Sequence, residues 1–273
     1  MEFFASYTGS DFLAFYAIML ATSVLAGIWI PAFLREEGRR GELSDVEEIA
    51  VLAGGAKRHV HAVTSSLFAK NALTEASKHK LRVARTEVGE SESERTVLTK
   101  VGDFTLGELR LTLRSRRMAI EAALEKRGLL MSSRDLTALR WVSVIPYAVL
   151  FAIGLYRQQA GEELGEPTGF LVGLLALTVG FAIWRLLAFN PRTQAGNAAL
   201  KQLEDRSSRL KRAPQANEAG YAVAIFGTGV LVGTPWEPLH AIQRSGGDAG
   251  SGGDGSDGGC GSGCGGGCGG CGG

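Results

Sequence analysis

Hydrophobic residues lie in four runs along the chain, separated by charged and polar segments. The first run, Phe12 to Leu34, has 23 residues and no charge, which is long enough for a helix to cross the roughly 30 Å hydrocarbon core of a bilayer. No lysine or arginine precedes this run. It therefore lacks the basic n-region of a signal peptide, and we interpret it as an uncleaved membrane helix.

The second and third runs predict a helical hairpin in the membrane. Trp141 to Tyr156 is flanked by arginines and has amphipathic aromatic residues at both ends, where interface anchors belong. Phe170 to Phe189 contains one charge, Arg185, which is close enough to the end of the run to extend into the headgroups. A short link with glycine and proline joins the two runs.

The fourth run, Tyr221 to Trp236, has 16 residues with three glycines and a proline. This length is marginal for a full crossing. We expect a fourth membrane helix, with a re-entrant or interfacial segment as the alternative.

Lysine and arginine in the flanks of these runs predict the orientation of the chain. None precedes the first run, whereas three arginines follow it closely. The link between the second and third runs is acidic, and residues 190–218 are basic. We therefore expect residues 1–11 outside and residues 35–140 and 190–218 in the cytoplasm. The C-terminal tail would be outside if the fourth run crosses, and cytoplasmic if it is re-entrant.

The polar middle, residues 35–140, predicts a small, mainly α-helical domain. Ser44 and Glu47 have capping-box spacing, an apolar helical face follows, and Gly54-Gly55 is expected to end this helix. A second helix then leads to two short strands around a turn near Ser77. Helix, tight turn, helix and strand pair together form the outline of a winged-helix unit.

A weaker second copy of this unit predicts a tandem arrangement. Thr105 begins another capping-box pattern, and Ala123–Leu130 resembles Ser66–Leu73 position for position in character. The acidic, polar stretch between the copies, EVGESESER, is expected to be a flexible loop.

A basic face is expected on the second helix and the strands that follow it. Its cations are Lys57, Arg58, Lys70, Lys78, Lys80, Arg82 and Arg85. We interpret it first as a solvated face beneath an anionic leaflet. A protein partner is the next alternative, and DNA is the least favoured. His59 and His61 are two residues apart and face different sides of a helix, so we do not expect them to share a metal ion.

Residues 190–218 predict a polar amphipathic helix with a sparse row of leucines. It could lie on the membrane surface or serve as a cytoplasmic connector that docks on the domain, and both remain open.

The C-terminal tail, residues 245–273, consists almost entirely of glycine, serine, aspartate and cysteine, a composition that predicts disorder. It holds all four cysteines of the chain, Cys260, Cys264, Cys268 and Cys271. Four thiolates on a compliant chain could wrap Zn²⁺ or Cu⁺, although only the last pair has the C-x2-C spacing of a zinc knuckle. Disulfide formation, modification by an enzyme that acts on cysteine, and a tail without function are the alternatives.

No enzyme signature is found in the sequence. It contains neither the H-E-x-x-H motif of metalloproteases nor a Walker phosphate loop. The net charge is +1, so no overall imbalance favours a nucleic-acid partner. We therefore expect a protein that is not an enzyme.

The segment LSDVEEIAVLAGGAKRHVHAVTSSLFAKNAL resembles the opening motif of an uncharacterised bacterial family of multi-pass membrane proteins with a Gly/Cys-rich C-terminus. The residues that match its LAGG motif are Ala50, Leu52, Ala53, Gly54, Gly55 and Arg58. Ala123–Leu130 and Arg192–Glu204 resemble later landmarks of that family. The resemblance implies a bacterial membrane protein and no particular activity.

Together these patterns predict an α-helical membrane protein with three or four transmembrane helices, a winged-helix-like cytoplasmic domain and a disordered tail. The expected function is metal capture or thiol chemistry on the tail of a bacterial inner-membrane protein. The alternative is a membrane-tethered regulator whose domain binds a protein or nucleic acid. The expected partners are the lipid bilayer, a metal ion or a cysteine-modifying enzyme at the tail, and a cytoplasmic protein.

Overall fold

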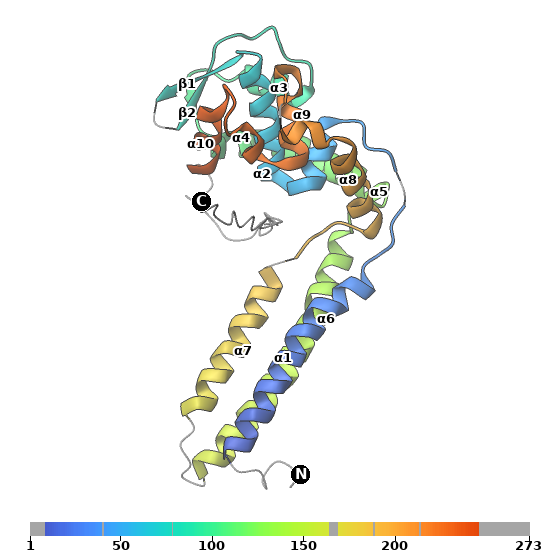
Figure 1. Cartoon of the computed structure of the whole chain (residues 1–273), viewed down its shortest axis with the longest axis vertical. Helices are drawn as coiled ribbons and strands as arrows, with labels where there is room; N and C mark the ends of the chain where they lie inside the picture. Colours follow the sequence, from blue (N-terminus) through green and yellow to red (C-terminus); the bar gives the residue numbers. More distant parts are fainter. Residues whose placement is uncertain are drawn as a thin grey trace, which may run out of the picture.

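Figure 1 shows a computed structural model of the chain, in which three long helices carry a helical domain at one end. The structure describes residues 9–39, 41–77, 79–163, 169–187, 189–212 and 214–245. The described part of the chain begins at the end of the long helices that is remote from the domain.

The long helices are α1 (Gly9–Leu34), α6 (Ser133–Glu163) and α7 (Gly169–Leu187), which we call the apolar bundle. Within the described residues, these three are long and apolar enough to cross a membrane. Their shared interior includes the apolar cluster Phe12, Tyr16, Leu20, Leu150, Leu171 and Leu175. The Tyr16 hydroxyl lies 3.0 Å from the Thr178 hydroxyl, so this buried polar pair satisfies itself.

Arg185, which the sequence predicts to extend into the headgroups, contacts α1. Pro31 lies inside α1 and has no N–H, so the carbonyl four residues earlier, that of Gly27, loses its helical donor. The Arg185 Nε donates to this carbonyl oxygen at 2.7 Å. The arginine of α7 thereby satisfies a backbone group that the proline of α1 leaves without its usual partner.

Replacing Arg185 by leucine is expected to destabilise the apolar bundle by about 1–2 kcal/mol, because the Gly27 carbonyl then lacks a donor. In a Pro31→Ala background, residue 31 regains its N–H, so the same replacement should cost less. Denaturation of the full-length wild type, the two single variants and the double variant in detergent measures this coupling. Equal losses in both backgrounds would show that Arg185 does not act through this carbonyl.

The helical domain is built from residues 41–132 and 189–245, so the α6–α7 hairpin interrupts it in sequence. Its elements are α2 (Val46–Ala69), β1 (Leu73–Ser77), β2 (Lys80–Val83), α3 (Glu92–Leu98), β3 (Asp103–Phe104), α4 (Leu106–Thr112), α5 (Arg114–Lys126), α8 (Gln194–Arg206), η2 (Ser208–Lys211), η3 (Ala216–Glu218), α9 (Ala219–Phe226), η4 (Thr228–Leu231) and α10 (Glu237–Ser245).

The expected strand pair is present as β1 and β2. They pair antiparallel, with Thr74 opposite Arg82, and the short strand β3 adds to β2 with Phe104 opposite Leu81. The sheet order is β1-β2-β3. Leu81 and Phe104 are buried on the face that joins the core.

Residues 221–236, where the sequence predicts a fourth membrane segment, form most of α9, then η4 and a turn, and α9 and η4 pack in the core of the helical domain. Ala222, Val223 and Ala224 are completely buried. A side chain at Gly220 would lie 2.7 Å from the Ser66 Cβ on α2, so small residues let α9 pack closely on α2. The apolar character of this run is therefore accounted for by protein packing, and the described part of the chain ends in the helical domain at α10.

The acidic stretch expected to be a loop contains a helix, α3. Ser91 and Glu94 form a capping box, in which the Ser91 Oγ accepts from the Glu94 N–H at 3.1 Å and the Glu94 carboxylate accepts from the Ser91 N–H. At the start of α2, Asp45 caps the helix instead of Ser44, because its carboxylate accepts from the Glu47 N–H at 3.0 Å.

Two features of the predicted second winged-helix copy are present: Thr105 caps α4, where its Oγ1 accepts from the Glu108 N–H at 3.3 Å, and the two copies share a helix ending. At the ends of α2 and α5, the Ala72 N–H donates to the Leu67 carbonyl, and the Leu129 N–H donates to the Leu124 carbonyl in the same way. Both endings contain a residue of positive φ, Asn71 in one and Gly128 in the other. After the first ending the chain forms β1. After the second it continues into α6, so no second strand pair follows there.

The basic segment 190–218 docks on the helical domain as the connector alternative predicts. It forms α8 and two short 3₁₀ helices, and Leu200 and Leu210 are buried in the domain core.

Candidate functional site

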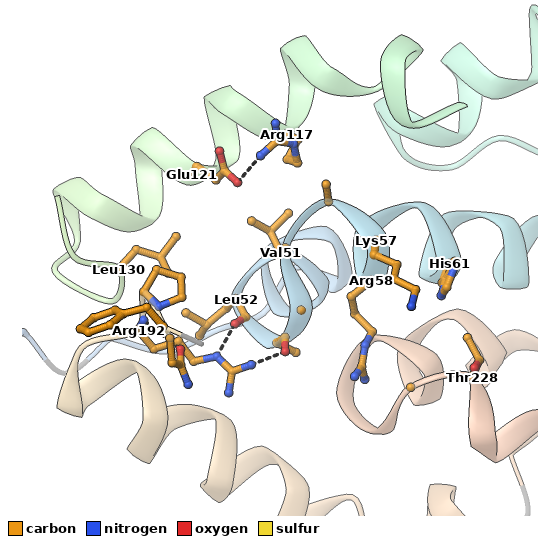
Figure 2. Close-up of a pocket in the computed structure, with 18 of the residues that line it drawn as sticks. Val51, Leu52, Lys57, Arg58, His61, Arg117, Glu121, Leu130, Arg192 and Thr228 are labelled. Atoms are coloured by element: carbon orange, nitrogen blue, oxygen red, sulfur yellow. Dashed lines mark hydrogen bonds and ion pairs between the residues drawn. The ribbon is translucent and has the colours of Figure 1, made fainter. Parts of the chain in front are cut away.

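Helix α2 breaks at Gly54-Gly55, where the sequence predicts the end of a helix. Gly55 has φ of 59° and ψ of −145°, a conformation that side chains with a Cβ rarely adopt. The break deprives the carbonyls of Leu52 and Ala53 of helical donors. Figure 2 shows the Arg192 guanidinium donating to both carbonyl oxygens, with Nε 2.6 Å from that of Leu52.

Arg58 lies on the other side of the break and holds the end of α9 (Figure 2). Its Nη1 donates to the carbonyls of Val223 and Ile225, each at 3.3 Å. Gly54 and Gly227 leave room for this side chain, because a Cβ on either would lie within 3.0 Å of an Arg58 atom. The LAGG segment and Arg58 thus join α2 to the C-terminal part of the chain.

The later segments singled out by the sequence also meet here. The Thr193 hydroxyl donates to the carbonyls of Gly128 and Leu129 at 2.8 and 3.1 Å, and its oxygen accepts from the Gly196 N–H at the start of α8. Residues 36–39, which leave α1, hydrogen-bond to the same segments. This junction connects the apolar bundle to the helical domain.

A cavity of about 270 Å³ opens beside the break in α2. Its cationic lining residues are Lys57, Arg58, Arg117, Arg140, Arg192 and Arg244. Glu121 is the one carboxylate in the described lining, and it pairs with Arg117 at 2.5 Å. The cavity therefore has a strong excess of positive charge.

Burial and this positive environment together lower two pKa values. Burial, followed by the charges of Lys57 and Arg58, lowers the pKa of His61 to about 3, so this ring is neutral at physiological pH. Burial and then the charge of Arg58 lower the pKa of Arg192. Gln243, also in the lining, donates its amide N–H groups to the His61 carbonyl and to two hydroxyls, while its Oε1 has no hydrogen-bond partner in the described structure.

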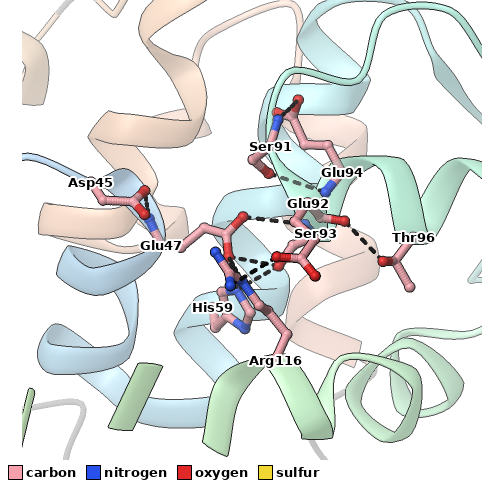
Figure 3. Close-up of polar contacts among 9 residues, drawn as sticks. All are labelled: Asp45, Glu47, His59, Ser91, Glu92, Ser93, Glu94, Thr96 and Arg116. Atoms are coloured by element: carbon pink, nitrogen blue, oxygen red, sulfur yellow. Dashed lines mark hydrogen bonds and ion pairs between the residues drawn. The ribbon is translucent and has the colours of Figure 1, made fainter. Parts of the chain in front are cut away.

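A separate buried cluster joins α2 to α3 and α5 (Figure 3). Glu47 accepts from the Ser93 hydroxyl at 2.7 Å and from the Arg116 Nε at 3.4 Å, and its Oε2 lies 3.4 Å from the His59 Nε2. Burial alone would raise the pKa of Glu47, but hydrogen bonds from groups that include His59 and Ser93 outweigh it and lower the pKa to about 2.

This cluster contains the residue types of a Ser–His–Glu triad in a different geometry. In a triad the serine donates to one ring nitrogen of histidine and the acid holds the other. Here Ser93 donates to Glu47 directly, both face the Nε2 of His59, and the His59 Nδ1 has no hydrogen-bond partner in the described structure. Glu47, His59 and Ser93 are at most 4% exposed, so these three side chains are closed to solvent in this structure.

The residues predicted as metal ligands, Cys260, Cys264, Cys268 and Cys271, lie outside the described residues. Among the described residues, no group of three or more histidine, cysteine, aspartate or glutamate side chains is placed to hold a metal. His59 and His61 face opposite surroundings, the Glu47 cluster and the cavity. No local pattern in the sequence indicates Arg192 as the partner of the α2 break, because their proximity arises from tertiary packing.

Several cations of the expected basic face are held by contacts within the protein. Lys70 pairs with Glu90 and Glu94, and Arg82 pairs with Asp103 at 2.6 Å. Arg58 caps α9, as described above, and Lys78 lies outside the described residues.

Comparison with known proteins returned no match: no protein-family model, no curated protein and no solved structure shows significant similarity to this chain.

Proposed function

We propose that this chain is a non-enzymatic protein of a bacterial inner membrane that presents its cysteine-rich tail in the cytoplasm, beside the helical domain, to capture Zn²⁺ or Cu⁺. The observation that carries the proposal is the position of α9 in the domain core against α2. Because α9 does not cross the membrane, the chain that follows α10 starts on the same side as the domain.

The charge distribution supports the cytoplasmic side. Two membrane passages, α6 and α7, separate the two sequence halves of the domain, so both halves lie on one side. Arginines follow the first apolar run and none precedes it, which by the positive-inside rule assigns that side to the cytoplasm. The cytoplasm keeps thiols reduced, and reduced thiolates bind Zn²⁺ and Cu⁺ strongly.

The tail cysteines are expected to react with a membrane-impermeant maleimide only after cells are permeabilised. Two single-cysteine variants in a Cys-free background provide matched controls. A cysteine at Val101, which is 97% exposed in the helical domain, should react as the tail does. A cysteine at Ser6, before the first apolar run, should react in intact cells. Reaction of the tail without permeabilisation would overturn the cytoplasmic assignment.

The same full-length protein tests metal capture. After purification in detergent under reducing conditions, it should bind about one Zn²⁺ per chain, since four thiolates complete a tetrahedral site. Replacing the four cysteines by serine should abolish this binding. A cytoplasmic tail that binds neither Zn²⁺ nor Cu⁺ would refute the metal proposal while leaving the topology intact.

The alternative function is a membrane-tethered regulator with a winged-helix-like domain. The hairpin that follows the second half of α2 supports this alternative, because a helix followed by such a wing is the recognition unit of that fold. The internal pairing of Lys70 and Arg82 counts against nucleic acid as the partner. Salt-dependent binding of DNA by the full-length protein would favour it.

A further inference from the structure

The cavity beside the α2 break lies where the apolar bundle meets the helical domain. Arg140 comes from α6 and Leu187 ends α7, and both line the cavity. Helix α6 has 31 residues, whereas about 20 suffice to cross the hydrocarbon core, so its polar first turns extend beyond the lipid tails. The cavity is therefore expected at the level of the lipid headgroups.

The positive charge of the cavity lining favours binding of an anion. Six cationic side chains line it against one carboxylate, Glu121, whose charge is already matched by Arg117. Arg58 and Arg192 approach from opposite sides of the α2 break (Figure 2). Arg192 uses its Nε and one terminal nitrogen on the backbone carbonyls of Leu52 and Ala53, and a guanidinium offers five N–H donors in all. Arg140 lies over the Phe189 ring at 5.8 Å, while its buried Nε has no hydrogen-bond partner in the described structure.

The size and donor set of the cavity favour a small, multiply charged group. At about 270 Å³, it lies just below the usual range of roughly 300–1,000 Å³ for sites that enclose a drug-sized ligand. Several arginines around one small space are the usual arrangement for phosphate, because each guanidinium can bind two of its oxygens. The second half of α2, residues 56–69, also begins at the cavity, where its dipole favours negative charge.

We propose that this cavity binds one phosphate group, supplied either by an anionic phospholipid in the adjacent leaflet or by a phosphate compound in solution. The bound group would connect Arg140 of α6, Arg192 of the segment that follows α7 and Arg244 of α10. It would thereby couple the position of the helical domain to the membrane surface. This proposal is independent of the metal chemistry of the tail.

The test uses the full-length protein in nanodiscs. In one arm, zwitterionic discs are titrated with inorganic phosphate, with chloride matched for ionic strength. In the other, discs contain phosphatidylglycerol, and lipid retained on the released protein is counted by native mass spectrometry. We expect saturable binding of one phosphate group per chain in at least one arm. The arm in which it occurs identifies the source.

Arg140→Gln and Arg244→Gln should each weaken this binding about tenfold, which is the effect of losing one charge-assisted hydrogen bond. Arg134→Gln is the matched control, because Arg134 is exposed on α6 and does not line the cavity. Arg244 is exposed at the cavity rim, so its variant tests the site even if Arg140→Gln perturbs folding. Equal weakening in the control, or no saturable binding in either arm, would overturn the proposal.

Discussion

Val223→Asp is expected to unfold the helical domain, whereas Val232→Asp is expected to leave it folded. The Val223 side chain is completely buried in the core, and Val232 is 55% exposed. An aspartate at position 223 would have no ionic partner in its apolar surroundings, so we expect a cost of about 4 kcal/mol or more. That is a large part of the 5–15 kcal/mol that typically stabilises a domain.

The pair of variants separates a core segment from a membrane segment. If residues 221–236 lay in lipid, a carboxylate at either position would face hydrocarbon and both variants would be damaged. Near-ultraviolet circular dichroism and protease resistance of the full-length protein in detergent distinguish these outcomes. Damage by both substitutions, or by neither, would contradict the packing of α9 on α2.

The apolar bundle could be predicted from the sequence because a membrane helix needs an apolar residue at almost every position. The uncharged run in α1, Phe12 to Leu34, is longer than the apolar segments of most helices in soluble proteins. The short run of α9 is different, because a protein core and a lipid core impose the same apolar composition over a few turns. Only its small residues, such as Gly220 and Ala222, indicated close packing against another helix, and small residues are also common between membrane helices.

Local sequence signals also explain which other elements of the helical domain could be predicted and which could not. Turn residues and alternation located β1 and β2. The stretch that contains the start of α3 is as polar as a loop, and the Ser91–Glu94 capping box is the one local signal that marks this helix. The Gly54-Gly55 break was predicted, but its partner Arg192 was not. The two sides of that contact, Ala53 and Arg192, lie 139 residues apart, and no local pattern encodes such a pairing.

Glu47→Gln is expected to destabilise the helical domain by about 3 kcal/mol at neutral pH. The buried Glu47 carboxylate interacts with Ser93, His59 and Arg116, and a neutral amide in its place would leave some of these groups without their partner. Glu92→Gln is the matched control. Glu92 also pairs with Arg116, at 2.8 Å, but its side chain is 69% exposed, and exposed ion pairs contribute at most about 1 kcal/mol. Chemical denaturation of the full-length variants provides the comparison.

The pH dependence of the Glu47→Gln effect tests its cause. The pKa of Glu47 is lowered from 4.5 to about 2 in the folded protein, so the unfolded chain binds the proton first as pH falls. The carboxylate therefore contributes its full stabilisation above about pH 4.5, and this contribution is lost as pH falls toward 2. The stability difference between wild type and Glu47→Gln should accordingly shrink across this interval. A difference that stays constant from pH 5 to 2 would mean that Glu47 stabilises the domain through packing alone, and that the contacts of its charged carboxylate with Ser93, His59 and Arg116 contribute little.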